Sequence, residues 1–241
     1  YAIGQFVNGQ LAENLGARNL IFVGLVSSAI INILFGYMNE LILFMILWGI
    51  NGYAQSTGWP SAVKIIRNWF SPDTLGSIGG LFGTCFLIGN MLAWAVLGRS
   101  LVSFGWRSVF LIPPLALIMM ALAFYLLVSD EPRGRRVLRK ADISNARSNL
   151  LHIFSSRRLI TIAIAYALLQ FVRSGLTLWA PIFVFEKYRL SLDVASYVAS
   201  VIPLGGIIGS IASGWVSDRM KKFGKTSIIS ILTLLLSLTI F

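Results

Sequence analysis

The chain has 241 residues, of which 56% are hydrophobic and only 12% are charged, and its mean hydropathy is +0.79. The surface of a soluble protein needs a larger share of charged residues, so this composition excludes an ordinary soluble domain. A single Cys and a single His exclude a disulfide framework and a multi-cysteine or multi-histidine metal site, and we expect neither metal nor cofactor.

Long apolar segments follow one another along the chain. A membrane-spanning helix needs about 20 mostly apolar residues, and in chain order the segments that meet this requirement are residues 20–37, 41–63, 76–98, 108–128, 159–185 and 194–216. Residues 1–12 and 227–241 resemble parts of two further spans, so we expect an internal fragment of a longer protein. The segments are too long and too continuous for barrel strands. The predicted fold class is an all-α membrane protein.

The charged residues lie almost entirely in the connections. The basic residues alternate between a richer side (Arg18, Lys64, Arg67, Arg133, Arg135, Arg136, Arg139, Lys140, Arg147, Arg157, Arg158, Arg219, Lys221, Lys222, Lys225) and a poorer side (Arg99, Arg107, Lys187, Arg189). The positive-inside rule makes the richer side cytoplasmic. The net charge of +11 is therefore mostly a signal of topology in a multi-pass protein of the plasma (inner) membrane, and it does not predict nucleic-acid binding.

The longest connection, residues 129–158, is strongly basic and predicts a cytoplasmic linker. It divides the chain into an N-terminal half, residues 1–128, and a C-terminal half, residues 159–241.

Two cytoplasmic connections share a pattern, which indicates an internal repeat of the kind found in secondary transporters. Each has a glycine, an acid four positions later and then a base: Gly9, Glu13 and Arg18 in the first copy, and Gly214, Asp218 and Arg219 in the second. A glycine lets another helix approach closely, and an acid can lie against a helix N-terminus and pair with a base. We predict a conformational latch in each copy; the alternative is an ordinary short loop with a capping acid.

These two stretches resemble the loop signature of the major facilitator superfamily after its second and eighth helices. Glu13 replaces the commoner Asp, and Asn14 stands where an Arg is usual. The resemblance implies a helical bundle with two pseudo-symmetric six-helix halves, truncated at both ends, with this chain covering about helices two to nine.

Residues 55–60 with Lys64 and residues 68–70, and residues 173–176 with residues 179–181, resemble the fourth and seventh helices of the organophosphate:phosphate antiporters. This resemblance implies a small organic anion as substrate and inorganic phosphate as a possible counter-substrate. Two family positions depart from the pattern of the glycerol-3-phosphate transporter, because Gln5 stands in place of a Lys and Phe86 in place of a substrate-site His.

Arg173 lies midway along the span of residues 159–185, where a guanidinium is costly and indicates a substrate pathway. Its spacing from Tyr166, Gln170 and Thr177 places all four on one helical stripe. A guanidinium suits a phosphate or a carboxylate; the alternative is an Arg satisfied by backbone carbonyls or by a carboxylate elsewhere. We predict substrate contacts from Arg173, Tyr166, Gln170, Trp179, Trp59 and Lys64, although the tryptophans could instead belong to an aromatic belt.

The sequence thus predicts a secondary active transporter, a monomer in the lipid bilayer, that exchanges small organic anions by alternating access. The predicted spans contain no carboxylate, and proton-driven carriers usually place one on the translocation path. The alternatives are a non-transporting membrane sensor of the same fold and a proton-coupled or neutral-solute carrier. No arrangement of nucleophile, base and orienting group predicts an enzyme or catalytic residues.

Overall fold

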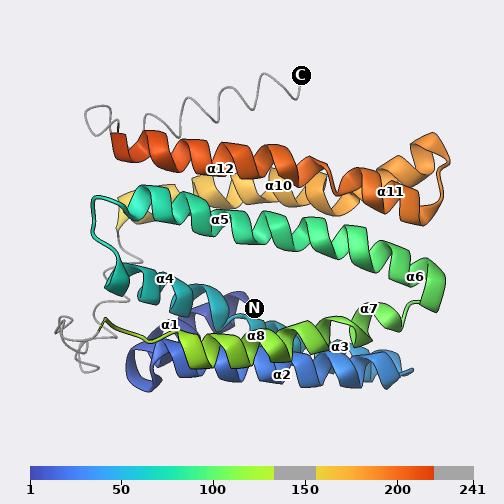
Figure 1. Ribbon diagram of the computed structural model, residues 1–241, viewed down its shortest axis with the longest axis horizontal. Coiled ribbons are helices and arrows are strands. Elements are labelled where there is room, and N and C mark those ends of the chain that lie inside the picture. Colours follow the sequence, from blue (N-terminus) through green and yellow to red (C-terminus); the bar gives the residue numbers. More distant parts are fainter. Residues whose placement is uncertain (133–155, 220–241) are drawn as a thin grey trace.

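The computed structural model describes residues 1–132 and 156–219, and every regular element within them is a helix. The helices run back and forth along one common direction (Figure 1). Most of the predicted linker and the predicted span of residues 227–241 lie outside the described residues.

The N-terminal half contains helices that run back and forth, and several of them pack around α2. Its elements are α1 (Ala2–Leu15), α2 (Ala17–Tyr37), α3 (Leu41–Gln55), α4 (Gly58–Trp69), α5 (Leu75–Leu92), the π-helical turn η1 (Ala93–Leu97), α6 (Gly98–Phe104), α7 (Ser108–Leu111) and α8 (Pro113–Leu127). Helix α2 contacts α1, α3, α4, α7 and α8. Its buried face consists largely of small residues, such as Ala17, Gly24, Ser28 and Ala29, which allow the neighbouring backbones to approach closely.

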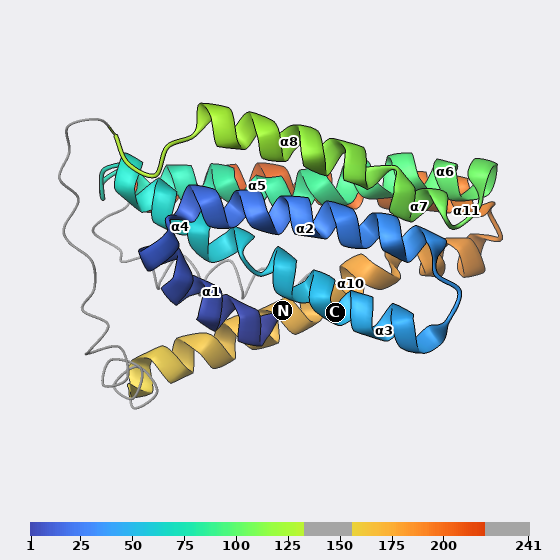
Figure 2. The same ribbon diagram turned by 90° about the horizontal axis from the view of Figure 1, so that it is seen from below.

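The described part of the C-terminal half contains α10 (Arg157–Tyr188), α11 (Leu192–Ala199) and α12 (Ile202–Arg219). Helix α12 packs along α5, so α5 lies between the C-terminal helices and the rest of the N-terminal half (Figure 1). In the second view, α10 runs obliquely to α2 and α8 (Figure 2).

Within the described residues, five segments are long and apolar enough to cross a membrane: Ala17–Tyr37, Leu75–Phe104, Ser108–Leu127, Leu159–Tyr188 and Leu192–Val216. They match five of the predicted spans, and they identify an integral, multi-pass membrane protein. The ends with more basic residues, including the N-terminus of α10 and the C-terminus of α12, gather at the left of Figure 1. The turns between α2 and α3, α6 and α7, and α10 and α11 gather at the right.

The predicted continuous span of residues 41–63 is wrong in one respect, because the helix breaks at Ser56 and Thr57, between α3 and α4. Pro60 has no backbone N–H to donate to the carbonyl of Ser56, four residues earlier. The side chains of Ser56 and Thr57 donate instead to the carbonyls of Tyr53 and Ala54, at 2.6 and 2.8 Å. These local hydrogen bonds replace part of the helical ladder.

The prolines have different effects in different helices. Pro113 begins α8 after the short helix α7, and Pro203 follows the break between α11 and α12. Pro181 lies inside α10, which continues through it. A proline at a helix start costs little because the first N–H groups have no partner within the helix.

Candidate functional site

Arg173 lies in the middle of α10 and reaches across to α5. Its Cζ atom lies 4.7 Å from the ring centroid of Phe86, and its Nη1 donates a hydrogen bond of 3.3 Å to Gln170 Oε1. The side chain is half-buried. In residues 1–132 and 156–219, no carboxylate forms an ion pair with it. The guanidinium is thus held by a ring face and a neutral amide, and neither of these two partners carries a charge that would neutralise it.

Trp59 and Arg173 each contact a phenylalanine of α5. The ring centroid of Trp59 is 4.9 Å from that of Phe82, and Phe82 lies four residues, about one helical turn, before Phe86. Trp59 and Arg173, which lie far apart in the sequence, therefore contact neighbouring turns of the same helix. A role for Trp59 in substrate contact stays a prediction.

The remaining predicted contacts on α10 lie along a continuous helix from Arg157 to Tyr188. Tyr166 and Trp179 are mostly exposed, and Thr177 is half-buried. An apolar hollow of about 470 Å³ lies farther along, where α10 turns into α11, and its lining includes Phe183, Tyr188 and Val198. Arg173 does not line this hollow, so the predicted polar stripe is separate from it.

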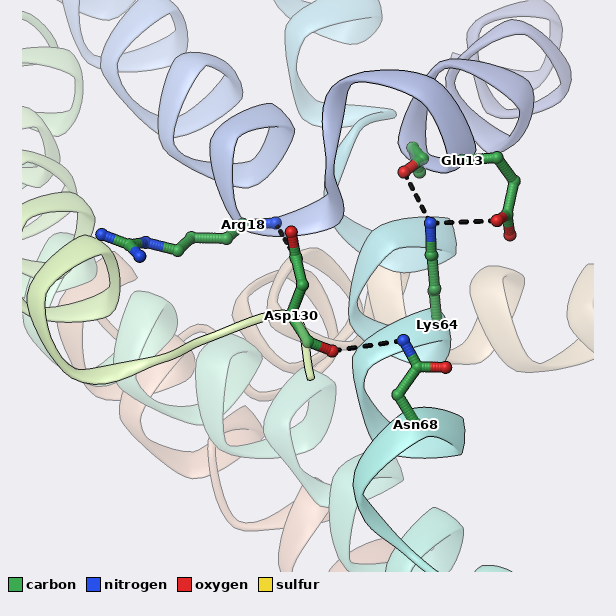
Figure 3. A network of polar contacts seen from close by, with 6 residues as sticks. Glu13, Arg18, Lys64, Asn68 and Asp130 are labelled. Atoms are coloured by element: carbon green, nitrogen blue, oxygen red, sulfur yellow. Dashed lines mark hydrogen bonds and ion pairs between the residues drawn. The ribbon is translucent and has the colours of Figure 1, made fainter. Parts of the chain in front are cut away.

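The sequence predicts a substrate contact for Lys64. In the structure its ammonium group contacts the C-terminal end of α1. Lys64 Nζ donates a hydrogen bond of 2.8 Å to the carbonyl oxygen of Ala12 and lies 3.0 Å from Glu13 Oε2. Figure 3 shows both contacts at the C-terminal end of α1. Lys64 therefore pairs with the acid of the first predicted latch, and its role in substrate contact stays a prediction.

Arg18 does not pair with Glu13 in the first predicted latch. Its guanidinium Cζ lies 4.1 Å from the ring centroid of Tyr125 on α8, and its backbone N–H donates a hydrogen bond of 2.7 Å to Asp130 Oδ1. Asp130 thus accepts from the first turn of α2, and Asn68 Nδ2 donates to the carbonyl of Asp130 at 3.2 Å (Figure 3).

The sequence patterns do not reveal this role of Asp130. The one signal for it is an acid placed directly after a span on the basic side of the protein, close to the start of the linker. Gly16 supports the contact: its φ of 85° suits the turn between α1 and α2, and a Cβ on it would lie 2.7 Å from Asp130 Oδ2.

Asp218, in the second predicted latch, lies against the N-terminus of α5. Its Oδ1 accepts a hydrogen bond of 3.0 Å from the backbone N–H of Gly76, and its Oδ2 accepts one of 2.6 Å from that of Ser77. The Ser77 hydroxyl donates to the same Oδ2 at 2.5 Å. A carboxylate there satisfies N–H groups that have no partner within the helix and stabilises the positive end of the helix dipole. Arg219 lies over the ring of Trp215, 4.1 Å from its centroid.

Small residues carry the contact between α5 and α12, and Gly214 of the second predicted latch is one of them. A Cβ on Gly214 would lie 2.7 Å from the carbonyl oxygen of Gly76, and one on Gly80 would lie 2.6 Å from that of Ser210. Ser210 Oγ also donates to the carbonyl of Gly80 at 2.7 Å. Gly79, Gly205 and Gly209 lie on the same two helices but away from this contact, because a Cβ on any of them would meet no heavy atom of a neighbouring described segment within 4 Å.

Gly9 of the first predicted latch lies less close to its neighbouring helix than Gly214 of the second does. A Cβ on it would lie 4.0 Å from Pro60 of α4, which is an ordinary van der Waals contact.

Within the described ranges, no group of three or more His, Cys, Asp or Glu residues could hold a metal ion.

Comparison with known proteins gives matches along the whole chain. Residues 1–241 match the profile of the Major Facilitator Superfamily. The chain is 25% identical, over 92% of its length, to a protein of Chlamydia muridarum named "Probable hexose phosphate transport protein". It is 25% identical over 91% to the Escherichia coli K12 "Membrane sensor protein UhpC", and 27% identical over 96% to the human "Sugar phosphate exchanger 3". It covers 54%, 54% and 55% of these proteins, respectively, and so spans about half their length.

Proposed function

The chain belongs to the Major Facilitator Superfamily, and on this premise we propose that it forms part of a secondary transporter that moves a small organic anion by alternating access. The observation that carries the proposal is the half-buried guanidinium of Arg173, which rests on a ring face and a neutral amide. A charge within a span is expensive, and a bound anion would neutralise it.

The proposed substrate class is an organophosphate. A guanidinium presents planar N–H groups that match two oxygens of a phosphate. The names of the Chlamydia and human relatives refer to hexose phosphate and sugar phosphate, which supports the same class. We propose inorganic phosphate as the counter-substrate.

Exchange follows from the same charge. An unliganded Arg173 disfavours the conformation that closes the site on both sides, and an anion that binds this conformation better shifts the population toward it. The halves then alternate only when the site is occupied. The contact of Asp218 with the N-terminus of α5 joins the two halves at the end rich in basic residues. We propose that it latches that end shut, and that Glu13 with Lys64 fastens α1 to α4 within the N-terminal half.

The proposed protein acts as a monomer in the plasma (inner) membrane, with residues 129–158 in the cytoplasm, and carries out no catalysis. The relatives that it matches bear the names of transporters and of a sensor. The unequal distribution of basic residues supports the orientation.

Counterflow in proteoliposomes tests the exchange. Vesicles loaded with phosphate and diluted into labelled glucose 6-phosphate should accumulate label, and Arg173→Ala should abolish accumulation while the protein still folds. Arg67→Ala, which removes an exposed arginine of α4, is the matched control and should transport normally. Uptake that needs a proton gradient and no internal anion would refute exchange. Arg173→Ala with unchanged uptake would refute the assigned site.

The second candidate is a non-transporting sensor, because one group of relatives bears that name. A sensor should bind glucose 6-phosphate, with a ligand-induced rise in Tm, but should show no counterflow. A neutral-solute carrier should show neither anion binding nor a requirement for Arg173.

A further inference from the structure

Phe86 lies against the guanidinium of Arg173, and the proposed transport cycle gives it no role. The two residues come from α5 and α10, and therefore from the two halves of the protein. Half of the Phe86 side chain is exposed, so the ring is not simply a buried core residue. The contact joins the halves at the proposed anion site.

The chemistry of the ring suits a cation that must also bind an anion. The face of an aromatic ring attracts a guanidinium through its quadrupole, but it carries no formal charge and is no competitor for the N–H groups. A carboxylate in the same place would neutralise Arg173 and compete with the substrate. Gln170, the other partner, is neutral and accepts from Nη1 alone.

From this geometry we infer that Phe86 is a positioning residue: its ring face holds the Arg173 guanidinium in the orientation in which the free N–H groups receive the phosphate. The inference rests on the proposed function. An arginine side chain has many rotamers, and fixing it before the substrate arrives lowers the entropy cost of binding. The anion affinity should then depend on the electron density of the ring and not only on its shape.

Fluorination of the ring separates electron density from shape. Phenylalanine with one, two or three ring fluorines at residue 86 keeps nearly the same volume but weakens the negative ring face stepwise. The probes are inorganic phosphate and glucose 6-phosphate, titrated against the purified protein in lipid nanodiscs. We expect Kd to rise with each fluorine, by about three- to tenfold in total, which is the scale of a cation–π contact. The Tm of the ligand-free protein should stay constant.

Phe171 provides the matched control. It lies on α10 two residues before Arg173, is 80% exposed, and points to another side of the helix. The same fluorinated series at residue 171 should leave Kd unchanged. Two ordinary substitutions complete the series: Phe86→Leu should weaken binding as much as the trifluorinated ring, and Phe86→Trp, with a stronger ring face, should preserve it.

Two results would overturn the inference in distinguishable ways. If Phe86→Leu weakens binding but fluorination does not, the residue acts by shape alone and the inference fails while the proposed function stands. If the unmodified protein binds neither probe, the proposed function fails and the inference fails with it.

Discussion

Asp130 and Asp218 perform the same electrostatic task in two regions of the molecule. Each lies at or just beyond the C-terminal end of a helix on the side rich in basic residues, and each accepts hydrogen bonds from the first turn of another helix: α2 for Asp130 and α5 for Asp218. The difference lies in which helices are joined. Asp130 links two helices of the N-terminal half, whereas Asp218 links the C-terminal half to the N-terminal half.

The surroundings of the two carboxylates differ accordingly. Neighbouring side chains fasten the stretch around Asp130, because Asn68 donates to its carbonyl and Trp69 Nε1 donates to that of Ser129 at 2.8 Å. Around Asp218 the helices meet through glycine faces, at Gly214, Gly76 and Gly80. Smooth faces with few interlocking side chains can separate as rigid bodies. We therefore expect the contact of Asp130 to persist within the N-terminal half, and the contact of Asp218 to be the one that the proposed transport cycle breaks.

The largest effect on transport should come from placing a bulky side chain in the contact between the glycine faces of α12 and α5. In Gly214→Val, the new Cβ would lie 2.7 Å from the carbonyl oxygen of Gly76 and 3.0 Å from Cα of Gly80. Backbone atoms cannot move aside as a flexible side chain can, so we expect counterflow to fall at least tenfold. Gly209→Val, on the same helix but with nothing within 4 Å of its Cβ, should transport normally. Equal losses from both substitutions would show that helix propensity, and not the contact with α5, is responsible.

Removing each carboxylate in turn should distinguish the contact of Asp218 from that of Asp130. Asp218→Ala removes acceptors for the N–H groups of Gly76 and Ser77, and a lost cap costs about 1–2 kcal/mol. Because this cap joins the halves, we expect its loss to shift the population toward the state that is open at the end rich in basic residues, by roughly tenfold. Spin labels on α5 and α12, with distances measured by double electron–electron resonance, would report the shift.

Asp130→Ala should behave differently although the lost contact is similar. We expect the free energy of unfolding to fall by about 1–2 kcal/mol, with the distance between the labels on α5 and α12 unchanged. A shift of that distance in Asp130→Ala, as large as in Asp218→Ala, would break the distinction between the two caps.

The smallest effect should come from the ion pair of Lys64 and Glu13. Their side chains are 18% and 39% exposed, and partly exposed ion pairs contribute about 0–1 kcal/mol. Lys64→Met should therefore lower the free energy of unfolding by less than about 1 kcal/mol, and it should leave the affinity for glucose 6-phosphate unchanged. Arg67→Met, on the same helix and exposed, is the control for the loss of a positive charge. A large loss of affinity in Lys64→Met alone would return Lys64 to the substrate site.

Hydropathy predicts the positions of most helices well because it acts on whole segments. The orientation in the membrane, which rests on the charge asymmetry, stays a prediction. The sequence also predicts that Asp218 can meet a helix N-terminus, since an acid after a glycine face has few other partners there. It does not reveal the contacts of Asp130 or the ion pair of Lys64 with Glu13, because both depend on which helix ends lie together. Short-range patterns contain no such information. The break at Ser56 is hidden for a related reason: Pro60 can kink, start or interrupt a helix, and packing decides which.

Replacing a helical glycine by alanine usually stabilises a helix, but the opposite should hold for the glycines that face the break between α3 and α4. A Cβ on Gly4 would collide with Ser56 Oγ, and one on Gly24 would collide with Thr57 Oγ1. Alanine, the best helix former, should therefore harm the protein at these two positions. On the exposed face of α3, a Cβ on Gly49 would have nothing within 4 Å. Gly49→Ala should therefore raise the free energy of unfolding by about 0.4–1 kcal/mol. Substitutions meant to stabilise the protein for structural work should thus alter exposed glycines such as Gly49 and spare Gly4 and Gly24, which pack against the break between α3 and α4.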